Sequence, residues 1–195
     1  MIQIESTDPG TYENAMADWI TTQLAPYPNV RLSRQEVLPG RPNLIAELTG
    51  DPSLPALVMI CHMDTVVVGD GWTLPPFDAI EKDGKIYGRG ACDMKSGLAC
   101  CLSAFQYAAE TLQTSGKTPK QTLKLICSMD EEDFMRGSEA CIQAGWVTDH
   151  DWVIDAEPTN GQIQMAHKGR TWYEIDVQGH TAHASTPWKG ADAIA

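Results

Sequence analysis

Apolar residues fall into short continuous runs that alternate with segments of helical spacing. The runs at 55–61, 123–128 and 152–155 lack the apolar–polar alternation of a half-exposed strand. Such runs are typical of strands that are buried on both faces. Two further strands are predicted at 30–37 and 43–48. The pattern predicts an α/β domain with a mixed, mostly parallel sheet.

Three helices are expected on the two faces of this sheet. The first is predicted to begin at Asp8 and Pro9, because aspartate is a favoured N-cap and proline a favoured first helical residue. Apolar residues then recur at helical spacing as far as Leu24. The other helices are predicted at 94–112 and at about 138–144. Between the first two helices, residues 65–87 are predicted to form a long loop with a small hairpin about Asp83 and Gly84.

The pattern changes after Glu157. Tyr173, Ile175 and Val177 alternate with polar residues, which indicates a half-exposed strand rather than a buried one. We therefore predict a first domain over residues 1–166 and the start of an α+β domain over 167–195.

Composition and charge disfavour some classes of binding partner. The chain has 14 lysines and arginines against 26 aspartates and glutamates, a formal net charge of -12. This balance disfavours nucleic acid and anionic membrane surfaces as partners. We found no signal peptide, no run long enough to span a bilayer and no Cys-x-x-Cys spacing among the six cysteines. A reducing, cytoplasmic location without disulfides is expected.

Candidate metal ligands follow the predicted buried strands. His62 and Asp64 come directly after the first run, and Glu131, Glu132 and Glu157 follow the two later runs. Asp93 lies in the glycine-rich segment before the second helix. Each has a simpler explanation alone, as a hydrogen-bonded turn histidine, a helix N-cap or a solvated charge run. Since strand ends meet at one edge of an open sheet, together they indicate a site for divalent ions, with zinc expected and cobalt or manganese as alternatives.

Residue spacing also suggests roles within this set. Asp64 is placed to accept the second N–H of the His62 ring. Adjacent side chains on an extended segment point in opposite directions, so of Glu131 and Glu132 one would bind metal and the other would act as general base. Asp93 is a candidate to bridge two ions, and Asp155 is a substitute should Glu157 point away.

Five motifs in order resemble the M20 family of metallopeptidases and amidohydrolases, which includes acetylornithine deacetylase, succinyl-diaminopimelate desuccinylase and glutamate carboxypeptidase. The motifs are His62-x-Asp64, Gly88-Arg-Gly-Ala-Cys-Asp93-Met-Lys, Asp130-Glu131-Glu132, Glu157-Pro-Thr and Gly179-His-Thr-Ala-His183-Ala-Ser-Thr-Pro. The resemblance runs from about Ala56 to the last residue. It implies that residues 1–166 are a metal-binding catalytic domain and that 167–195 begin a lid and dimerisation domain.

The resemblance implies a role for each matched residue. Asp93 would bridge two zinc ions, His62 and Glu157 would complete the first site, and Glu132 would belong to the second. Glu131 would be the general base that activates a metal-bridging water, with Asp64 orienting His62. His183 would reach the substrate carbonyl, in dimeric members across the subunit interface. The resemblance also implies a cis peptide after Asp93.

Two function classes follow from these patterns. The first is a zinc-dependent hydrolase that cleaves an amide bond of an N-acyl amino acid or a small peptide, as a homodimer when full length. The second is a catalytically incomplete metal-binding or dimerisation fragment, because members of the family continue further and supply a late histidine ligand. Outside the motifs, His150 and His167 are the substitutes for that histidine.

Overall fold

The computed structural model describes residues 1–194, and its central feature is a five-stranded mixed sheet. The strands lie in the order β2 (Arg31–Leu38), β3 (Arg41–Leu48), β8 (Leu123–Ser128), β4 (Leu57–His62) and β9 (Trp152–Asp155). β4 pairs in parallel with both β8 and β9, whereas β3 pairs antiparallel with β2 and β8. Four strands therefore run in one direction, which confirms the predicted α/β fold with its mixed, mostly parallel sheet.

The parallel strands bring their carboxyl ends to one edge of the sheet. His62 at the end of β4 lies opposite Ser128 of β8, and Ile60 lies opposite Asp155 of β9. Segments that leave these ends are therefore close neighbours in space, and in open α/β sheets ligands bind at this edge.

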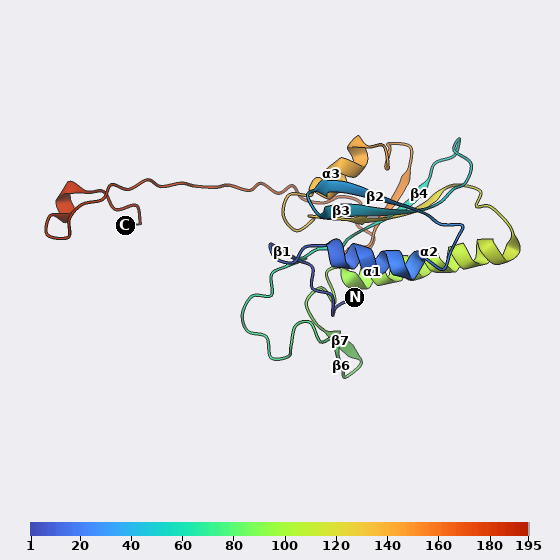
Figure 1. Cartoon of the computed structure of the whole chain (residues 1–195), viewed down its shortest axis with the longest axis horizontal. Coiled ribbons are helices and arrows are strands. Elements are labelled where there is room, and N and C mark those ends of the chain that lie inside the picture. Colours follow the sequence, from blue (N-terminus) through green and yellow to red (C-terminus); the bar gives the residue numbers. More distant parts are fainter. Residues whose placement is uncertain (195) are drawn as a thin grey trace. The chain divides into compact units, whose positions relative to one another are not determined.

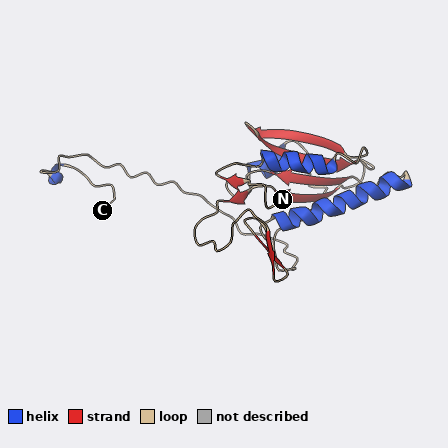
Figure 2. Cartoon of the chain, turned by 60° about the horizontal axis from the view of Figure 1, so that its bottom comes forward, coloured by secondary structure: helices blue, strands red, loops and turns tan. Residues whose placement is uncertain are grey.

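Helices cover both faces of the sheet (Figures 1 and 2). α1 (Asn14–Leu24) and α2 (Lys95–Ser115) pack on one face, and α3 (Arg136–Gln143) packs on the other. β8 shows why both faces are apolar: Leu125 lies in the core under α1 and α2, while Ile126 lies in the core under α3. A strand between two helical layers has no polar face, which explains the continuous apolar runs of the sequence.

Two small pairings complete this part of the chain. β1 (Thr7–Asp8) pairs in parallel with β5 (Thr65–Val66). β6 (Ile80–Lys82) and β7 (Lys85–Tyr87) form the predicted hairpin. Its two turn residues, Asp83 and Gly84, both have positive φ, as a tight two-residue hairpin turn requires.

The first helix begins later than predicted. α1 starts at Asn14, and Asp8 lies in β1 instead of capping a helix. The carboxylate of Asp8 accepts a hydrogen bond from Arg41. A buried ion pair with a residue distant in sequence thus outweighs the local capping preference.

The chain divides into two compact units, Met1–Gly161 and Gln162–Ala195. The half-exposed strand predicted about Tyr173 is wrong, because residues 162–179 form no strand in the part of the chain that the structure describes. A strand needs a neighbour for its backbone hydrogen bonds, and the pairing in this unit is a single bridge between His180 and Ala191. That residues 1–166 form a catalytic domain and that 167–195 begin a lid and dimerisation domain stays a prediction.

Among residues 1–194, no helix combines the length and apolarity needed to cross a membrane.

Gly97 allows α2 to lie against the end of β9. A β-carbon at this position would overlap the backbone carbonyl oxygen of Ala156. We expect Gly97→Ala to lower the free energy of unfolding by about 1–3 kcal/mol, the usual cost of overpacking. Urea unfolding measures this loss. Ser103→Ala, on an exposed position of the same helix, is the control and should change stability by less than about 0.5 kcal/mol; equal effects of the two changes would contradict the close-approach argument.

Candidate metal centre

The carboxyl-terminal edge of the parallel strands brings His62 together with two carboxylates. Nε2 of His62 lies 3.2 Å from Oδ1 of Asp93 and 3.4 Å from Oε1 of Glu157. The histidine side chain is 1% exposed, whereas those of Asp93 and Glu157 are 55% and 33% exposed. The cluster therefore has a rigid, buried base and an open side. Because Glu157 faces His62, Asp155 is not needed in its place.

Asp64 contacts the second ring nitrogen of His62, Nδ1. Nδ1 of His62 lies 2.8 Å from the backbone carbonyl oxygen of Asp64 and 3.5 Å from its carboxylate. A carbonyl oxygen only accepts, so Nδ1 carries a proton and donates it. In the neutral ring the lone pair then lies on Nε2, facing the acidic cluster. The predicted contact between Asp64 and the ring exists, with the backbone carbonyl as the nearer partner.

The Asp64 carboxylate also accepts hydrogen bonds from the backbone of the acidic turn, which the sequence did not suggest. Oδ1 accepts the backbone N–H of Glu131 at 3.2 Å, and Oδ2 accepts the backbone N–H of Glu132 at 3.0 Å. Asp64 is fully buried. It therefore links the segment after β4 to the acidic segment after β8.

Glu131 and Glu132 lie in a turn rather than on an extended segment. One oxygen of each and a ring nitrogen of His62 lie within 4.8 Å of one another. The prediction that the two side chains point in opposite directions is therefore wrong, because side chains alternate only where the backbone is extended. Both glutamates lie beside His62. Which of them binds metal and which acts as general base stays a prediction.

Electrostatics at the cluster reflect the crowding of acidic groups. Burial, together with the nearby Asp93 charge, raises the pKa of Glu132 to about 7. The His62 ring lowers the pKa of Asp93, more than burial raises it. Burial alone would lower the pKa of His62, but Asp64, Asp93 and Glu157 raise it well above its ordinary range. The cluster is thus built to hold positive charge, either a proton on His62 or a cation.

The donor atoms fit a divalent ion. In a tetrahedral zinc site, bond lengths of about 2.0–2.2 Å put neighbouring ligand atoms about 3.3 Å apart. The distances of 3.2 Å and 3.4 Å from Nε2 of His62 to Asp93 and Glu157 match this separation. One imidazole with several carboxylates is also a donor set suited to zinc, manganese or cobalt. The Asp93–Met94 peptide bond is cis, which confirms the expectation for this position.

His183 belongs to the second unit, whereas the cluster belongs to the first. Its Nδ1 accepts the backbone N–H of Ser185 at 3.2 Å, and the Ser185 hydroxyl lies 2.9 Å away. Since Nδ1 accepts, the proton of the neutral ring lies on Nε2, which is then a hydrogen-bond donor.

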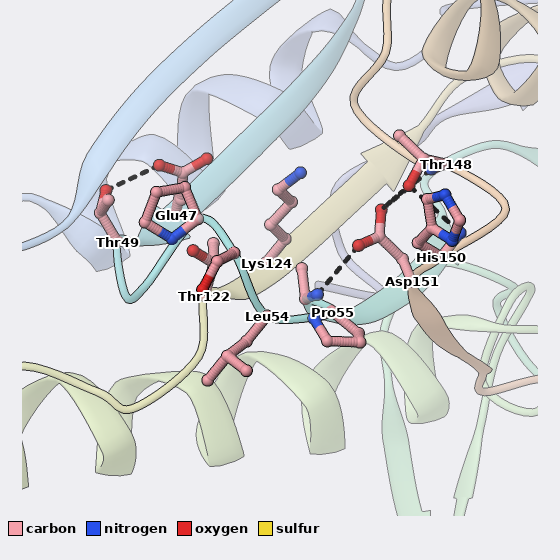
Figure 3. A pocket seen from close by; sticks show the side chains of 12 residues that line it. Glu47, Thr49, Leu54, Pro55, Thr122, Lys124, Thr148, His150 and Asp151 are labelled. Carbon is pink, nitrogen blue, oxygen red and sulfur yellow. Dashed lines mark hydrogen bonds between the residues drawn. The ribbon is translucent and has the colours of Figure 1, made fainter.

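A large pocket of about 680 Å³ lies at the opposite end of the parallel strands, lined by residues such as Lys124, Thr148 and His150 (Figure 3). None of the ligands predicted from the motifs lines it, but the substitute His150 does. The side chain of His150 is 86% exposed and pairs with Asp149, so it does not substitute for a ligand at the His62 cluster. His167 belongs to the second unit and bonds the adjacent Lys168 carbonyl.

Asp151 beside this pocket should give the protein a small acid sensitivity. Partial burial raises its pKa, but the N–H groups of Ala56 and Thr148 and the Thr148 hydroxyl outweigh this and lower the pKa. The carboxylate therefore stabilises the fold above its unfolded pKa of about 3.9, and this contribution is lost as the pH falls through the lower folded pKa. In urea unfolding, wild type should exceed Asp151→Asn in stability at pH 6, and the difference should shrink below pH 4. Asp149→Asn, at an exposed neighbour, is measured alongside as the comparison, and a constant Asp151 difference would contradict the prediction.

Sequence reasoning missed three residues next to the cluster: Glu13, Arg41 and Asn43. Glu13 and Asn43 are fully buried and Arg41 is 7% exposed. Asn43 and Glu13 accept backbone N–H groups of the segment that carries Glu131 and Glu132, and Arg41 donates to Glu13. No short motif contains them, and buried charged residues far apart in sequence have no local signal.

Comparison with known proteins supports the resemblance. Residues 58–193 match the peptidase family M20/M25/M40. The chain is 38% identical over 156 residues to a probable succinyl-diaminopimelate desuccinylase of Staphylococcus aureus, covering 79% of this chain and 38% of that protein. It is 34% identical over 187 residues to an acetylornithine deacetylase of Proteus mirabilis, covering 93% of this chain and 44% of that one.

A solved structure shares the fold. The M20 family metallo-carboxypeptidase Sso-CP2 of Sulfolobus solfataricus superposes with a TM-score of 0.61 at 22% identity, over 80% of this chain and 35% of that chain. The match thus spans less than half the length of each of these three proteins. On the family match and on identities above 30%, the chain belongs to the M20 family of peptidases and deacylases.

Proposed function

We propose that the protein is a metal-dependent hydrolase that cleaves the amide bond of an N-acyl amino acid or a small peptide. The observation that carries this proposal is the approach of Asp93 and Glu157 to Nε2 of His62, at distances that suit a shared ion. The relatives named desuccinylase and deacetylase favour an acyl amino acid over a peptide. Because the chain covers less than half of those relatives, the activity is proposed for the whole protein.

We propose two ions at the carboxylates around His62. His62, Asp93 and Glu157 would hold the first ion, and Glu132 would hold the second, with Asp93 shared between them. When bound, two divalent ions polarise the substrate carbonyl and lower the pKa of an attacking water. Zinc suits this donor set best, and cobalt or manganese are alternatives.

The remaining residues bind, orient or move protons. Asp64 fixes the His62 ring through its carbonyl and the two glutamates through its carboxylate. Glu131 lies 3.9 Å from Nε2 of His62. We assign it as the general base that accepts a proton from the attacking water and passes it to the leaving nitrogen. His183, with its proton on Nε2, would donate to the oxygen that becomes negative in the transition state.

The direct test combines metal analysis with a hydrolysis screen. We expect the purified chain to bind two zinc or cobalt ions, and the whole protein to release the acyl group from N-succinyl or N-acetyl amino acids. Dipeptides are the comparison substrates and would separate a deacylase from a peptidase. A chain that binds no divalent ion would contradict the proposal.

A second possibility is a metal-binding or dimerisation fragment without turnover. It is favoured by the short span of the chain relative to the relatives. Two bound ions without hydrolysis by this chain, and with hydrolysis by a longer form, would support it. The homodimer through residues 167–195 is likewise a proposal, which light scattering on the two forms would test.

A further inference from the structure

The turn that carries Glu131 and Glu132 is held by side chains rather than by the sheet. Four successive backbone N–H groups, those of residues 129–132, donate to side-chain oxygens from other elements. The acceptors are Asn43 Oδ1 at 3.0 Å for Met129, Glu13 Oε1 at 3.2 Å for Asp130, and the Asp64 carboxylate at 3.2 Å and 3.0 Å for Glu131 and Glu132. The position of both glutamates therefore depends on where these acceptors stand.

Arg41, the first residue of β3, holds the acceptor Glu13. Its Nε and Nη2 donate to the two carboxylate oxygens of Glu13 at 2.9 Å and 2.5 Å. Nη2 also lies 2.5 Å from Oδ2 of Asp8 and 3.3 Å from Oδ1 of Asp130. The guanidinium further lies over the ring of Tyr12, 4.1 Å from its centroid. One buried side chain thus joins the segment before α1 to the start of the acidic turn.

Charge explains why this contact is strong. Asp8, Glu13 and Asp130 are at most 9% exposed, and Arg41 is 7% exposed. Buried carboxylates are stable as anions only when they are paired and hydrogen-bonded. Arg136 also binds Asp130, at 2.6 Å and 2.7 Å, whereas both carboxylate oxygens of Glu13 accept from Arg41. Arg41 is therefore the cation that fixes Glu13.

We propose that Arg41 is a positioning residue of the metal centre: it clamps Glu13 against the backbone N–H of Asp130 and so sets where Glu131 and Glu132 stand relative to His62. The inference rests on the proposed function, because it assigns the acidic turn to the second ion. Arg41 does not contact the donor atoms itself, so its effect should fall on the ion that Glu132 holds and spare the one that Asp93 and Glu157 hold with His62.

Arg41→Lys is the sharpest variant. Lysine keeps the positive charge but lacks the planar fork that binds both oxygens of Glu13. Arg34→Lys is the matched control, because Arg34 also joins the α1 region to the sheet, through the exposed contacts with Asp18 and Asn14.

Two measurements are made on each protein. Hydrogen exchange reports protection of the amides of residues 129–132, and a zinc or cobalt titration reports the affinities of the two ions. In Arg41→Lys we expect faster exchange in this turn and about tenfold weaker binding of the second ion, the lower end of the loss seen when supports of metal ligands are removed. Binding of the first ion and exchange in β4 and β8 should match wild type, and Arg34→Lys should match it throughout.

Other outcomes would overturn the inference. Unchanged exchange in the turn would show that Arg41 does not position it. Equal weakening of the binding of both ions, together with faster exchange throughout the sheet, would show that Arg41 has only a general structural role. Should Arg41→Lys fail to fold, Glu13→Gln tests the same clamp, since it keeps the side-chain length but puts an amide where Arg41 needs two acceptor oxygens. It should show the same selective pattern, and its absence would equally refute the inference. A wild-type chain that binds no ion would refute the proposed function instead, while the exchange data would still decide whether Arg41 positions the turn.

Discussion

Glu131→Gln is expected to lower the hydrolysis rate by about 10²–10⁴-fold while both ions stay bound. A positioned general base typically contributes this much, and glutamine cannot accept the proton. Its backbone N–H would still bond Asp64, so the turn should keep its shape. Steady-state kinetics and metal analysis on the active form measure the two effects separately.

Glu132→Gln should behave differently, because this residue is proposed to donate an electron pair to the second ion. We expect it to lose that ion and the activity together. Asp133→Asn, which removes another carboxylate of the same turn, is the control and should keep both ions and most of the rate. If Glu131→Gln loses an ion while Glu132→Gln keeps both, the two roles are exchanged.

Divalent metal should stabilise the folded chain strongly. An ion that binds only the folded state adds about 4 kcal/mol when its free concentration is 1,000 times its Kd. At the His62 cluster it would also relieve the repulsion between Asp93 and the neighbouring glutamates. We therefore expect zinc to raise the free energy of unfolding by about this amount, and a chelator to reverse the gain.

The matched variants for this test are His62→Ala and His150→Ala. His62 contacts the carboxylates of the cluster, whereas His150 is exposed at the opposite end of the parallel strands. The quantity compared is the change in stability on adding metal within each variant, so a loss of packing does not enter. His62→Ala should lose most of the gain and His150→Ala should keep it. Equal gains in both variants would place the ion elsewhere.

Local patterns were sufficient for most of the sheet and helices. Strand β4 ends at His62, where its apolar run stops, and the hairpin of β6 and β7 turns at Asp83 and Gly84. Hydrophobic periodicity and turn chemistry are properties of neighbouring residues, so they can be read without the fold. The start of α1 was predicted wrongly because Asp8 pairs with Arg41, a partner that no local pattern reveals.

The half-exposed strand predicted about Tyr173 failed for a related reason. Alternation shows which faces a strand would present, but a strand exists only where another one completes its hydrogen bonds. In the part of the chain that the structure describes, residues 162–179 have no such neighbour.

The sequence by itself determined which side chains gather at this edge. His62, Asp93, Glu157 and the two glutamates follow buried strands or precede a helix, and strand ends meet at one edge of the sheet. The tertiary structure alone decided how these groups are held. Glu13 accepts the N–H of Asp130 from 117 residues away, and Asp64 accepts those of Glu131 and Glu132 from 67 and 68 residues away. Such contacts depend on how α1, β3 and β8 pack, and packing brings together residues whose separation in the chain carries no signal of their contact.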